Sequence, residues 1–301
     1  MFRNAIAGTL IFTMALSLTT FTESTAQVKT NSPQQQVQIP EISTPKTEEM
    51  IDVGGRKLHC CVYGKNGPTV VLVSGFGAPQ SYWNTVVPDL AALTTVVTFD
   101  RAGIGKSEIG EIPTHGLQSA KDILTLLVKL NVPAPYILVG HSYGGDVVRL
   151  FASMYPDHMG GLVLEDTQHE DVLEEQRKIL KGKDLEALEQ MAARFATPEN
   201  PKTETDYLNT TKEQVRSSKP LPRMPFVVLS AGDRLNAMPP MFSEDGKKEL
   251  AALGLKLQQR LVSLVPDCEH IVVEGVGHNI HVEKPGAVIE PVIKMVNKLR
   301  K

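Results

Sequence analysis

The sequence predicts an α/β fold with a mostly parallel sheet that helices cover on both faces. Short β-branched apolar runs recur along the chain, and helix-length segments separate them. Continuous apolar runs are typical of strands buried on both faces, and their alternation with helices is typical of parallel sheets. The predicted strands are 69–74, 95–99, 136–140, 161–165, 225–230 and 270–274, and the predicted helices include 117–130, 144–154 and 284–299.

The composition excludes several classes of protein. The chain has 301 residues with 31 Lys+Arg against 34 Asp+Glu, so its net charge is −3 and it lacks the basic excess of nucleic-acid-binding proteins. Its three cysteines (Cys60, Cys61 and Cys268) are too few for a disulfide scaffold and contain no paired zinc-binding pattern. We expect no structural disulfide, no metal and no cofactor, and a small molecule as the partner.

The N-terminus predicts a secretory signal peptide over residues 1–26. Arg3 precedes a short apolar run, and Ser24 and Ala26 supply the small residues of a cleavage site after Ala26. The run is too short and too rich in Thr for a transmembrane anchor, so no membrane span is expected after cleavage. Residues 27–47 are polar and read as a flexible tether. These features predict a secreted or periplasmic protein.

Residues 48–301 are predicted to form the folded domain. It opens with a β-hairpin, 50–53 and 57–63, across Gly54 and Gly55. Residues 167–220 interrupt the strand–helix rhythm with a charged insertion that has helical spacing over 172–196. We expect a helical cap over the C-terminal strand edge, where open α/β sheets bind ligands. The alternative is a solvated helical excursion without substrate contact.

A candidate nucleophile lies in the segment Gly140-His141-Ser142-Tyr143-Gly144. This segment follows a predicted strand and opens a predicted helix, which is the setting of the G-x-S-x-G nucleophile elbow. The flanking glycines permit a tight turn, and the turn exposes the Ser142 hydroxyl above the sheet.

A serine needs a base to act as a nucleophile. His278 is the best candidate, because it follows the last predicted strand and stands late in the chain, as the order Ser–acid–His requires. His281 is a rival, but it is better interpreted as a residue at the entry of a helix.

Two aspartates compete for the acid that orients the histidine. Asp166 ends the strand 161–165, and Asp233 follows the strand 225–230. Both lie at the C-terminal edge of the predicted sheet. We favour Asp166 and keep Asp233 as the alternative.

An oxyanion formed in acyl transfer needs backbone N–H donors. Tyr143, directly after the nucleophile, supplies one, and Phe76 in the loop Ser74-Gly75-Phe76-Gly77 supplies the other. The segment DRAGIGKS (100–107) resembles half of a phosphate-binding loop, but Asp100 stands where such a loop needs its first glycine. We interpret this segment as a structural turn near the site.

Together these motifs identify a family. SGFG (74–77), DRAGIGKS (100–107), GHSYGG (140–145) and GVGHNIHVEKP (275–285) occur in the order found in the α/β-hydrolase superfamily, which the chain resembles from about residue 50 to 300. The resemblance implies an eight-stranded, mostly parallel sheet, with Ser142 as nucleophile and His278 as base. Family members commonly carry the acid after the strand that ends here at Ser230, and some carry it one strand earlier, where Asp166 stands.

The sequence departs from the family pattern at two places. Ser74 replaces the histidine common before the oxyanion glycine, and the loop at Asp233 fits the usual acid spacing poorly. Ser142 also differs from the aspartate that epoxide hydrolases and haloalkane dehalogenases of the family use at this position.

The expected function is therefore a serine hydrolase that cleaves a small ester or related acyl compound. The alternatives are cofactor-free lyase or perhydrolase chemistry on the same residues, and a catalytically silent binding protein.

Overall fold

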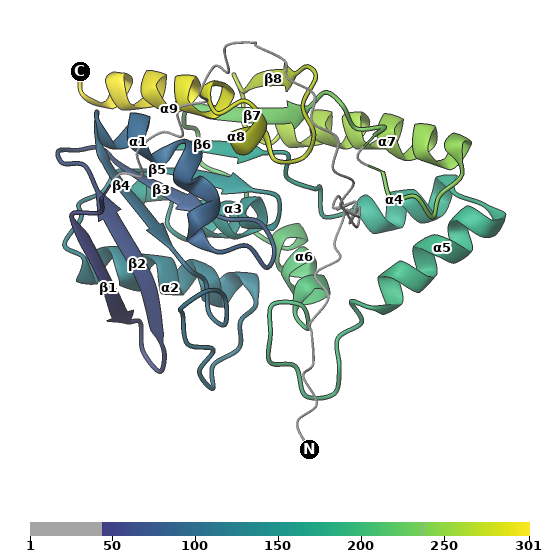
Figure 1. Cartoon of the computed structure of the whole chain (residues 1–301), viewed down its shortest axis with the longest axis horizontal. Coiled ribbons are helices and arrows are strands. Elements are labelled where there is room, and N and C mark those ends of the chain that lie inside the picture. The colour runs from purple at the N-terminus through teal and green to yellow at the C-terminus, as the bar shows by residue number, and fades with distance from the viewer. Residues whose placement is uncertain (1–43, 237) are drawn as a thin grey trace, which may run out of the picture.

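The computed structural model of the chain describes residues 44–236 and 238–301. The predicted signal peptide and residues 27–43 of the predicted tether lie outside these ranges. An eight-stranded sheet forms the centre of the described part, in the order β1-β2-β4-β3-β5-β6-β7-β8 (Figure 1). The strands are β1 (Thr47–Asp52), β2 (Lys57–Tyr63), β3 (Thr69–Val73), β4 (Thr95–Phe99), β5 (Tyr136–His141), β6 (Met159–Glu165), β7 (Phe226–Ala231) and β8 (Glu269–Val273).

The sheet is parallel from β4 to β8 and antiparallel at its first edge. β1 pairs antiparallel with β2, and β2 pairs antiparallel with β4. The predicted hairpin is thus confirmed, and β1 begins at Thr47, one residue before the predicted start of the domain. Gly54 and Gly55 both have positive φ values, 97° and 90°, which few other residues tolerate in the turn.

Helices cover both faces of the sheet, as the alternation predicted. They are η1 (Gln80–Thr85), α1 (Val87–Ala91), α2 (Gly116–Lys129), α3 (Tyr143–Met154), η2 (Pro156–His158), α4 (Val172–Ile179), α5 (Gly182–Ala193), α6 (Leu208–Arg216), α7 (Glu244–Val262), α8 (Ile280–Glu283) and α9 (Gly286–Leu299). Figure 1 shows α9 and α2 on opposite sides of the strands.

The two faces of the sheet belong to two separate apolar cores because strand side chains alternate between faces. Val70 and Leu72 of β3 pack in the core that contains α1 and α9, whereas Val71 and Val73 pack in the core that contains α2 and α3. All five β3 residues are buried, which explains the uninterrupted apolar run in the sequence.

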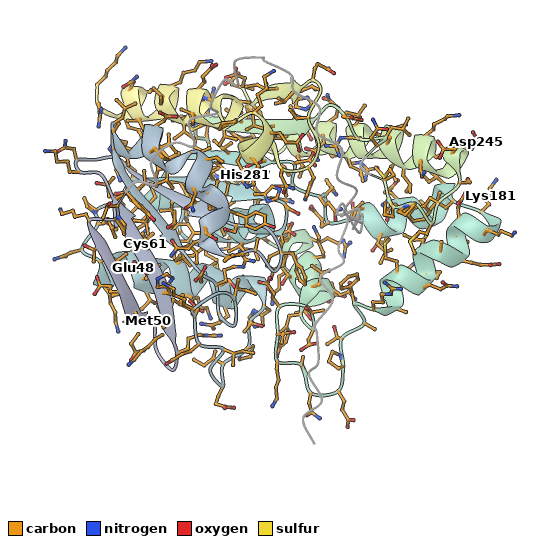
Figure 2. The ribbon with its side chains drawn as sticks, viewed as in Figure 1. Glu48, Met50, Cys61, Lys181, Asp245 and His281 are labelled. Carbon is orange, nitrogen blue, oxygen red and sulfur yellow. The ribbon has the colours of Figure 1, made fainter. Side chains whose placement is uncertain are left out.

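The segment predicted as a cap lies between β6 and β7 and contains α4, α5 and α6. The predicted helical stretch 172–196 is divided in two, because Leu180 is extended (ψ 147°) and Gly182 has a φ of 52°. α4 and α5 share a small apolar core with the start of α7, formed by Leu180, Leu188, Met191, Phe242 and Leu250. Figure 2 shows Lys181 and Asp245 together at the outer end of this unit, far from Glu48 and Met50 on β1.

The three cysteines lie in two separate parts of the sheet. Cys60 and Cys61 lie on β2, Cys268 precedes β8 near the opposite edge of the sheet, and all three are free.

Within the described ranges, no helix has the length and the hydropathy needed to cross a membrane.

Candidate active site

Ser142 occupies the turn between β5 and α3 in a backbone conformation rare for serine. Its φ is 51° and its ψ is −118°, and its N–H donates to the carbonyl of Glu165 at 2.9 Å. A Cβ at Gly144 would lie 2.2 Å from the carbonyl oxygen of Val73, so the turn can approach β3 only with glycine there. Local sequence thus builds a sharp strand-to-helix turn, and strain of this kind is typical of functional sites.

His278 pairs with Asp166. The imidazole Nδ1 lies 2.7 Å from Asp166 Oδ2, and Asp166 stands directly after β6 with a φ of 41°. The N–H of Asp166 donates to the carbonyl of Leu229 at 2.8 Å, and its Oδ1 accepts from the N–H of Ala231 at 3.1 Å. Hydrogen bonds to β7 therefore hold Asp166 in place independently of its contact with His278.

The Asp166 carboxylate is held in its ionised form. Burial by itself would raise the pKa of this group, but the hydrogen bond with His278 and the charge of Arg234 lower the pKa to about 2. Arg234 lies in the loop after β7 and forms an ion pair with Asp166 Oδ1. An acid that stays ionised can stabilise the positive charge that a histidine gains when it accepts a proton.

Asp233, the alternative acid, has other partners. Its carboxylate accepts from the side-chain amide of Asn236 at 2.9 Å and from the N–H of Asn236 at 3.4 Å. The loop after β7 thus brings Arg234, rather than the Asp233 carboxylate, to the histidine side of the sheet edge.

His141 links the loop that contains His278 to the turn that contains Ser142. Its ring lies 4.7 Å from that of His278, and its Nε2–H donates to the His278 carbonyl at 3.0 Å. Burial lowers the pKa of His141 to about 3, so the ring is neutral at physiological pH. Among the described residues, the side-chain hydrogen bond of His278 runs to Asp166 and not to Ser142. In unliganded sites such contacts often tighten only when substrate binds.

His281, the rival base, is fully buried in α8 and belongs to another pair. Its Nδ1 lies 2.7 Å from Glu165 Oε1, and its backbone N–H donates to the same oxygen at 2.8 Å. Its ring lies against Trp83, with the centroids 4.6 Å apart, and Figure 2 places it near the middle of the molecule. The sequence analysis did not assign a role to Glu165. The signal that could have pointed to this residue is a single acidic side chain at the end of an apolar strand.

The side chains of Phe76 and Tyr143, the two residues proposed to supply the oxyanion donors, pack against each other. The rings of Phe76 and Tyr143 meet edge to face with centroids 5.9 Å apart. Within the described part of the chain, neither backbone N–H donates a hydrogen bond. Tyr143 is the first residue of α3, where an N–H has no partner inside the helix. Both N–H groups are therefore available to an oxyanion.

A cavity of about 480 Å³ opens over Ser142. Its apolar lining includes Phe76 and Tyr143 from the sheet edge and Met191, Phe195 and Leu208 from the segment after β6. Charged residues also line it, among them Asp146, Lys212 and Arg216. A second, smaller cavity of about 70 Å³ is lined by Asp166, His278 and Arg234.

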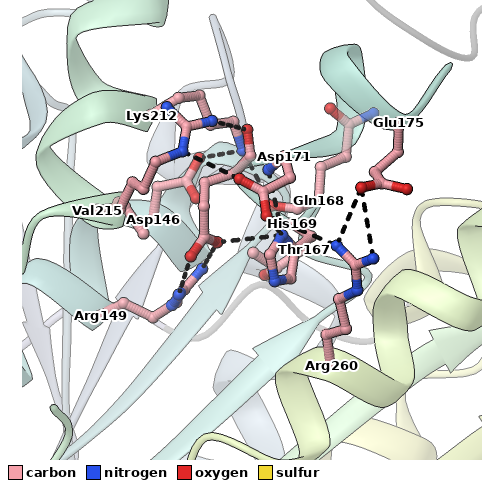
Figure 3. Close-up of polar contacts among 12 residues, drawn as sticks. Asp146, Arg149, Thr167, Gln168, His169, Asp171, Glu175, Lys212, Val215 and Arg260 are labelled. Carbon is pink, nitrogen blue, oxygen red and sulfur yellow. Dashed lines mark hydrogen bonds and ion pairs between the residues drawn. The ribbon is translucent and has the colours of Figure 1, made fainter. Parts of the chain in front are cut away.

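Ion pairs fasten the segment after β6 to α3 and α7, and the pairs to α3 are largely buried. Lys212 of α6 lies 2.7 Å from Asp146 of α3, and Arg149 of α3 binds both oxygens of Glu170. Figure 3 shows Asp146 and Lys212, and it also shows the pair between Arg260 of α7 and Glu175. The roof of the larger cavity is thus tied directly to α3, the helix that begins directly after Ser142.

Two groups of side chains bring three potential metal-binding atoms within 4.8 Å of one another: Glu48, His59 and Cys61, and His141, Glu165 and His281. In each group a histidine nitrogen is hydrogen-bonded to the carboxylate, His59 to Glu48 at 2.8 Å and His281 to Glu165 at 2.7 Å. These bonds account for the close approach of the side chains.

Comparisons with known proteins agree with this architecture. A model of the alpha/beta hydrolase fold family matches residues 68–256. The uncharacterized protein YqjL of Bacillus subtilis (strain 168) is 28% identical over 231 residues, which cover 75% of the chain and 82% of YqjL. A protein named as a carbamate hydrolase, RutD of Agrobacterium fabrum, is 33% identical over 112 residues, which cover 36% of the chain and 42% of RutD.

Solved structures share the fold. The enol-lactonase from Burkholderia xenovorans LB400 superposes with a TM-score of 0.58 at 18% identity, covering 83% of this chain and 100% of that one. A thermophilic esterase from Thermogutta terrifontis gives a TM-score of 0.55 at 21% identity, covering 82% and 95%.

Proposed function

Because the chain belongs to the alpha/beta hydrolase fold family, we propose that it is a serine hydrolase that cleaves a small ester or related acyl compound. The observation that carries the proposal is the 2.7 Å pair between His278 and Asp166 at the sheet edge where Ser142 turns out of β5. A buried carboxylate on one ring nitrogen of a histidine leaves the other nitrogen as the base that a serine nucleophile needs.

In the acylation step, Ser142 Oγ attacks the substrate carbonyl carbon while its proton passes to His278 Nε2. The N–H groups of Phe76 and Tyr143 donate hydrogen bonds to the negatively charged tetrahedral oxygen. The bond from carbon to the leaving oxygen then breaks, and the alcohol departs with the proton from His278. Asp166 stays ionised throughout and stabilises the imidazolium.

In the deacylation step, water attacks the acyl carbon on Ser142, and His278 takes a proton from it. The bond between the acyl carbon and Oγ breaks, the carboxylic acid leaves, and Oγ recovers its proton. The steps of this proposed mechanism use no cofactor or metal.

The cavity supports a substrate of modest size. Its volume of about 480 Å³ lies in the range of small-molecule sites, and Phe76, Met191 and Phe195 contribute apolar surface to its lining. The acyl part of an ester can pack against these apolar side chains. We assign the segment 167–220 as the cap that closes the site, because its residues form most of the roof.

We also propose that the protein is exported after cleavage behind Ala26. The support comes from the sequence of residues 1–26 alone. Intact mass of the protein recovered from the periplasm or medium of an expressing bacterium tests this, since processing at Ala26 leaves Gln27 as the first residue.

A fluorophosphonate probe tests the proposed activity. We expect one adduct on the mature protein, located at Ser142 by peptide mapping, and its loss in Ser142→Ala and His278→Ala. Turnover of short-chain esters then has to yield acid and alcohol in equal amounts. Labelling without hydrolysis would favour lyase or perhydrolase chemistry, and a folded protein that does not react would support the binding-protein alternative.

A further inference from the structure

The segment DRAGIGKS contains a buried arginine that the proposed chemistry does not yet use. Arg101 follows β4 and is 3% exposed. Its Nη1 donates to the carbonyl of Ser74 at 2.5 Å, and its Nη2 donates to the carbonyl of Gly75 at 2.7 Å. Its Cζ also lies 5.3 Å from the centre of the Tyr143 ring. One guanidinium thus touches both parts of the proposed oxyanion hole.

The bond to Gly75 has a geometric consequence. The Gly75 carbonyl and the Phe76 N–H belong to one planar trans peptide unit, in which they point in opposite directions. When Arg101 fixes the carbonyl, it therefore fixes the direction of the Phe76 N–H. The loop contains Gly75 and Gly77, the second with a φ of 65°, so its backbone by itself offers little resistance to rotation.

A residue of the cap completes this arrangement. Glu204 lies between α5 and α6, is 4% exposed, and binds Arg101 through both oxygens, at 2.9 Å to Nε and 3.0 Å to Nη2. Its Oε1 also accepts from the N–H of Gly77 at 2.6 Å. Glu204 thus holds the peptide that follows Phe76, while Arg101 holds the peptide that precedes it.

We propose that Arg101 and Glu204 are positioning residues that orient the Phe76 N–H of the oxyanion hole, so that the hole is complete only when the cap is docked. This inference rests on the proposed serine-hydrolase function. It assigns to the cap a second task besides roofing the cavity, and it assigns a role to the arginine of the DRAGIGKS turn.

Arg101→Met tests the proposal against Arg56→Met as its matched control. Arg56 is equally buried and also donates to two carbonyls, those of Ile109 and Pro113, and it pairs with Asp122. It lines neither cavity. Both variants lose the same kind of interaction, so they share any effect of general destabilisation, which thermal melting measures.

The readout is the ratio of kcat for an aryl ester to kcat for its thionoester, using the ester that the wild-type protein cleaves fastest. Sulfur accepts hydrogen bonds poorly, so an intact oxyanion hole favours the oxygen ester. We expect Arg101→Met to lose about 10- to 100-fold in kcat for the ester, to keep KM within about threefold, and to lower the ratio by about tenfold. Glu204→Gln should lower the ratio by a smaller factor, and Arg56→Met should leave it unchanged.

The possible failures are distinguishable. A wild-type protein that neither cleaves esters nor reacts with a fluorophosphonate overturns the proposed function and this inference with it. Normal wild-type turnover with an unchanged ratio in Arg101→Met overturns only the role of Arg101, as does an equal loss of kcat in Arg56→Met. An unchanged ratio in Glu204→Gln overturns the contribution of the cap.

Discussion

Arg234 and His278 bind the same carboxylate from two neighbouring loops. Arg234 pairs with Oδ1 of Asp166 and His278 lies 2.7 Å from Oδ2, so the loops after β7 and β8 meet at the residue that directly follows β6. The pairing joins a permanent positive charge to the carboxylate that the proposed mechanism requires to stay ionised. Because Arg234 and Asp166 are both largely buried, water screens their interaction little.

Removal of the Arg234 charge should change the pH dependence of activity. Without this cation, the Asp166 carboxylate loses one of the charges that lower its pKa, so Arg234→Met should lose activity at a higher pH than the wild-type protein does as the pH falls. Steady-state kinetics from pH 4 to 9 measure the shift. Arg223→Met is the control, because Arg223 pairs with Asp267 on the exposed surface; a shift in both variants would contradict a local effect.

The two candidate acids can be separated by isosteric substitution. Asp166→Asn removes the charge that contacts His278 and should lower kcat by about 10⁴-fold. Asp233→Asn should stay close to the wild-type rate, because Asp233 bonds to Asn236 instead. Ester turnover by both variants decides the matter, and a large loss confined to Asp233→Asn would refute the assignment of Asp166.

The buried pair of Glu165 and His281 should contribute strongly to the free energy of unfolding. His281→Leu leaves the Glu165 carboxylate buried without its imidazole partner, which should reduce the free energy of unfolding by about 3–5 kcal/mol. The double variant Glu165→Met/His281→Leu should lose less than the sum of the two single variants. Urea unfolding of the four proteins closes this cycle, and simple additivity would show that the pair is not coupled.

The same pair predicts a pH dependence of stability. Burial by itself would raise the pKa of Glu165, but His281 and His141 lower the pKa by more than burial raises it. The pKa of Glu165 in the folded state therefore lies below the usual value of 4.5. A carboxylate of this kind contributes stability that is present above its unfolded pKa and is lost as the pH falls through its folded pKa. The wild-type advantage over Glu165→Gln should therefore be constant near neutral pH and shrink below about pH 4.5.

The close approach of Gly144 to the Val73 carbonyl predicts that one added methyl group at this position lowers the stability of the fold. Gly144→Ala places a Cβ 2.2 Å from the Val73 carbonyl and should lower the free energy of unfolding by about 1–3 kcal/mol. Gly286→Ala is the matched control, because nothing lies within 4 Å of its Cβ and α9 begins there. Chemical denaturation compares the two, and equal effects would contradict the steric argument.

Much of the fold was predictable because its signals are local. Each parallel strand is a continuous apolar run, and the hairpin turn depends on two adjacent glycines, so a short window of sequence specifies each element. The break between α4 and α5 was missed because the helical spacing continues across Leu180. There the backbone turns at Gly182, and α5 packs against the start of α7, more than 50 residues away.

The sequence by itself determined the turn at Ser142, since glycine spacing between a strand and a helix dictates its shape. It also ordered the candidate serine, acid and histidine along the chain. Only the tertiary structure decided which carboxylate contacts His278, and it alone brought Glu204 of the proposed cap to Arg101. These contacts join residues 112 and 103 positions apart. They depend on how neighbouring strand ends and the cap pack together, and no local pattern encodes such packing.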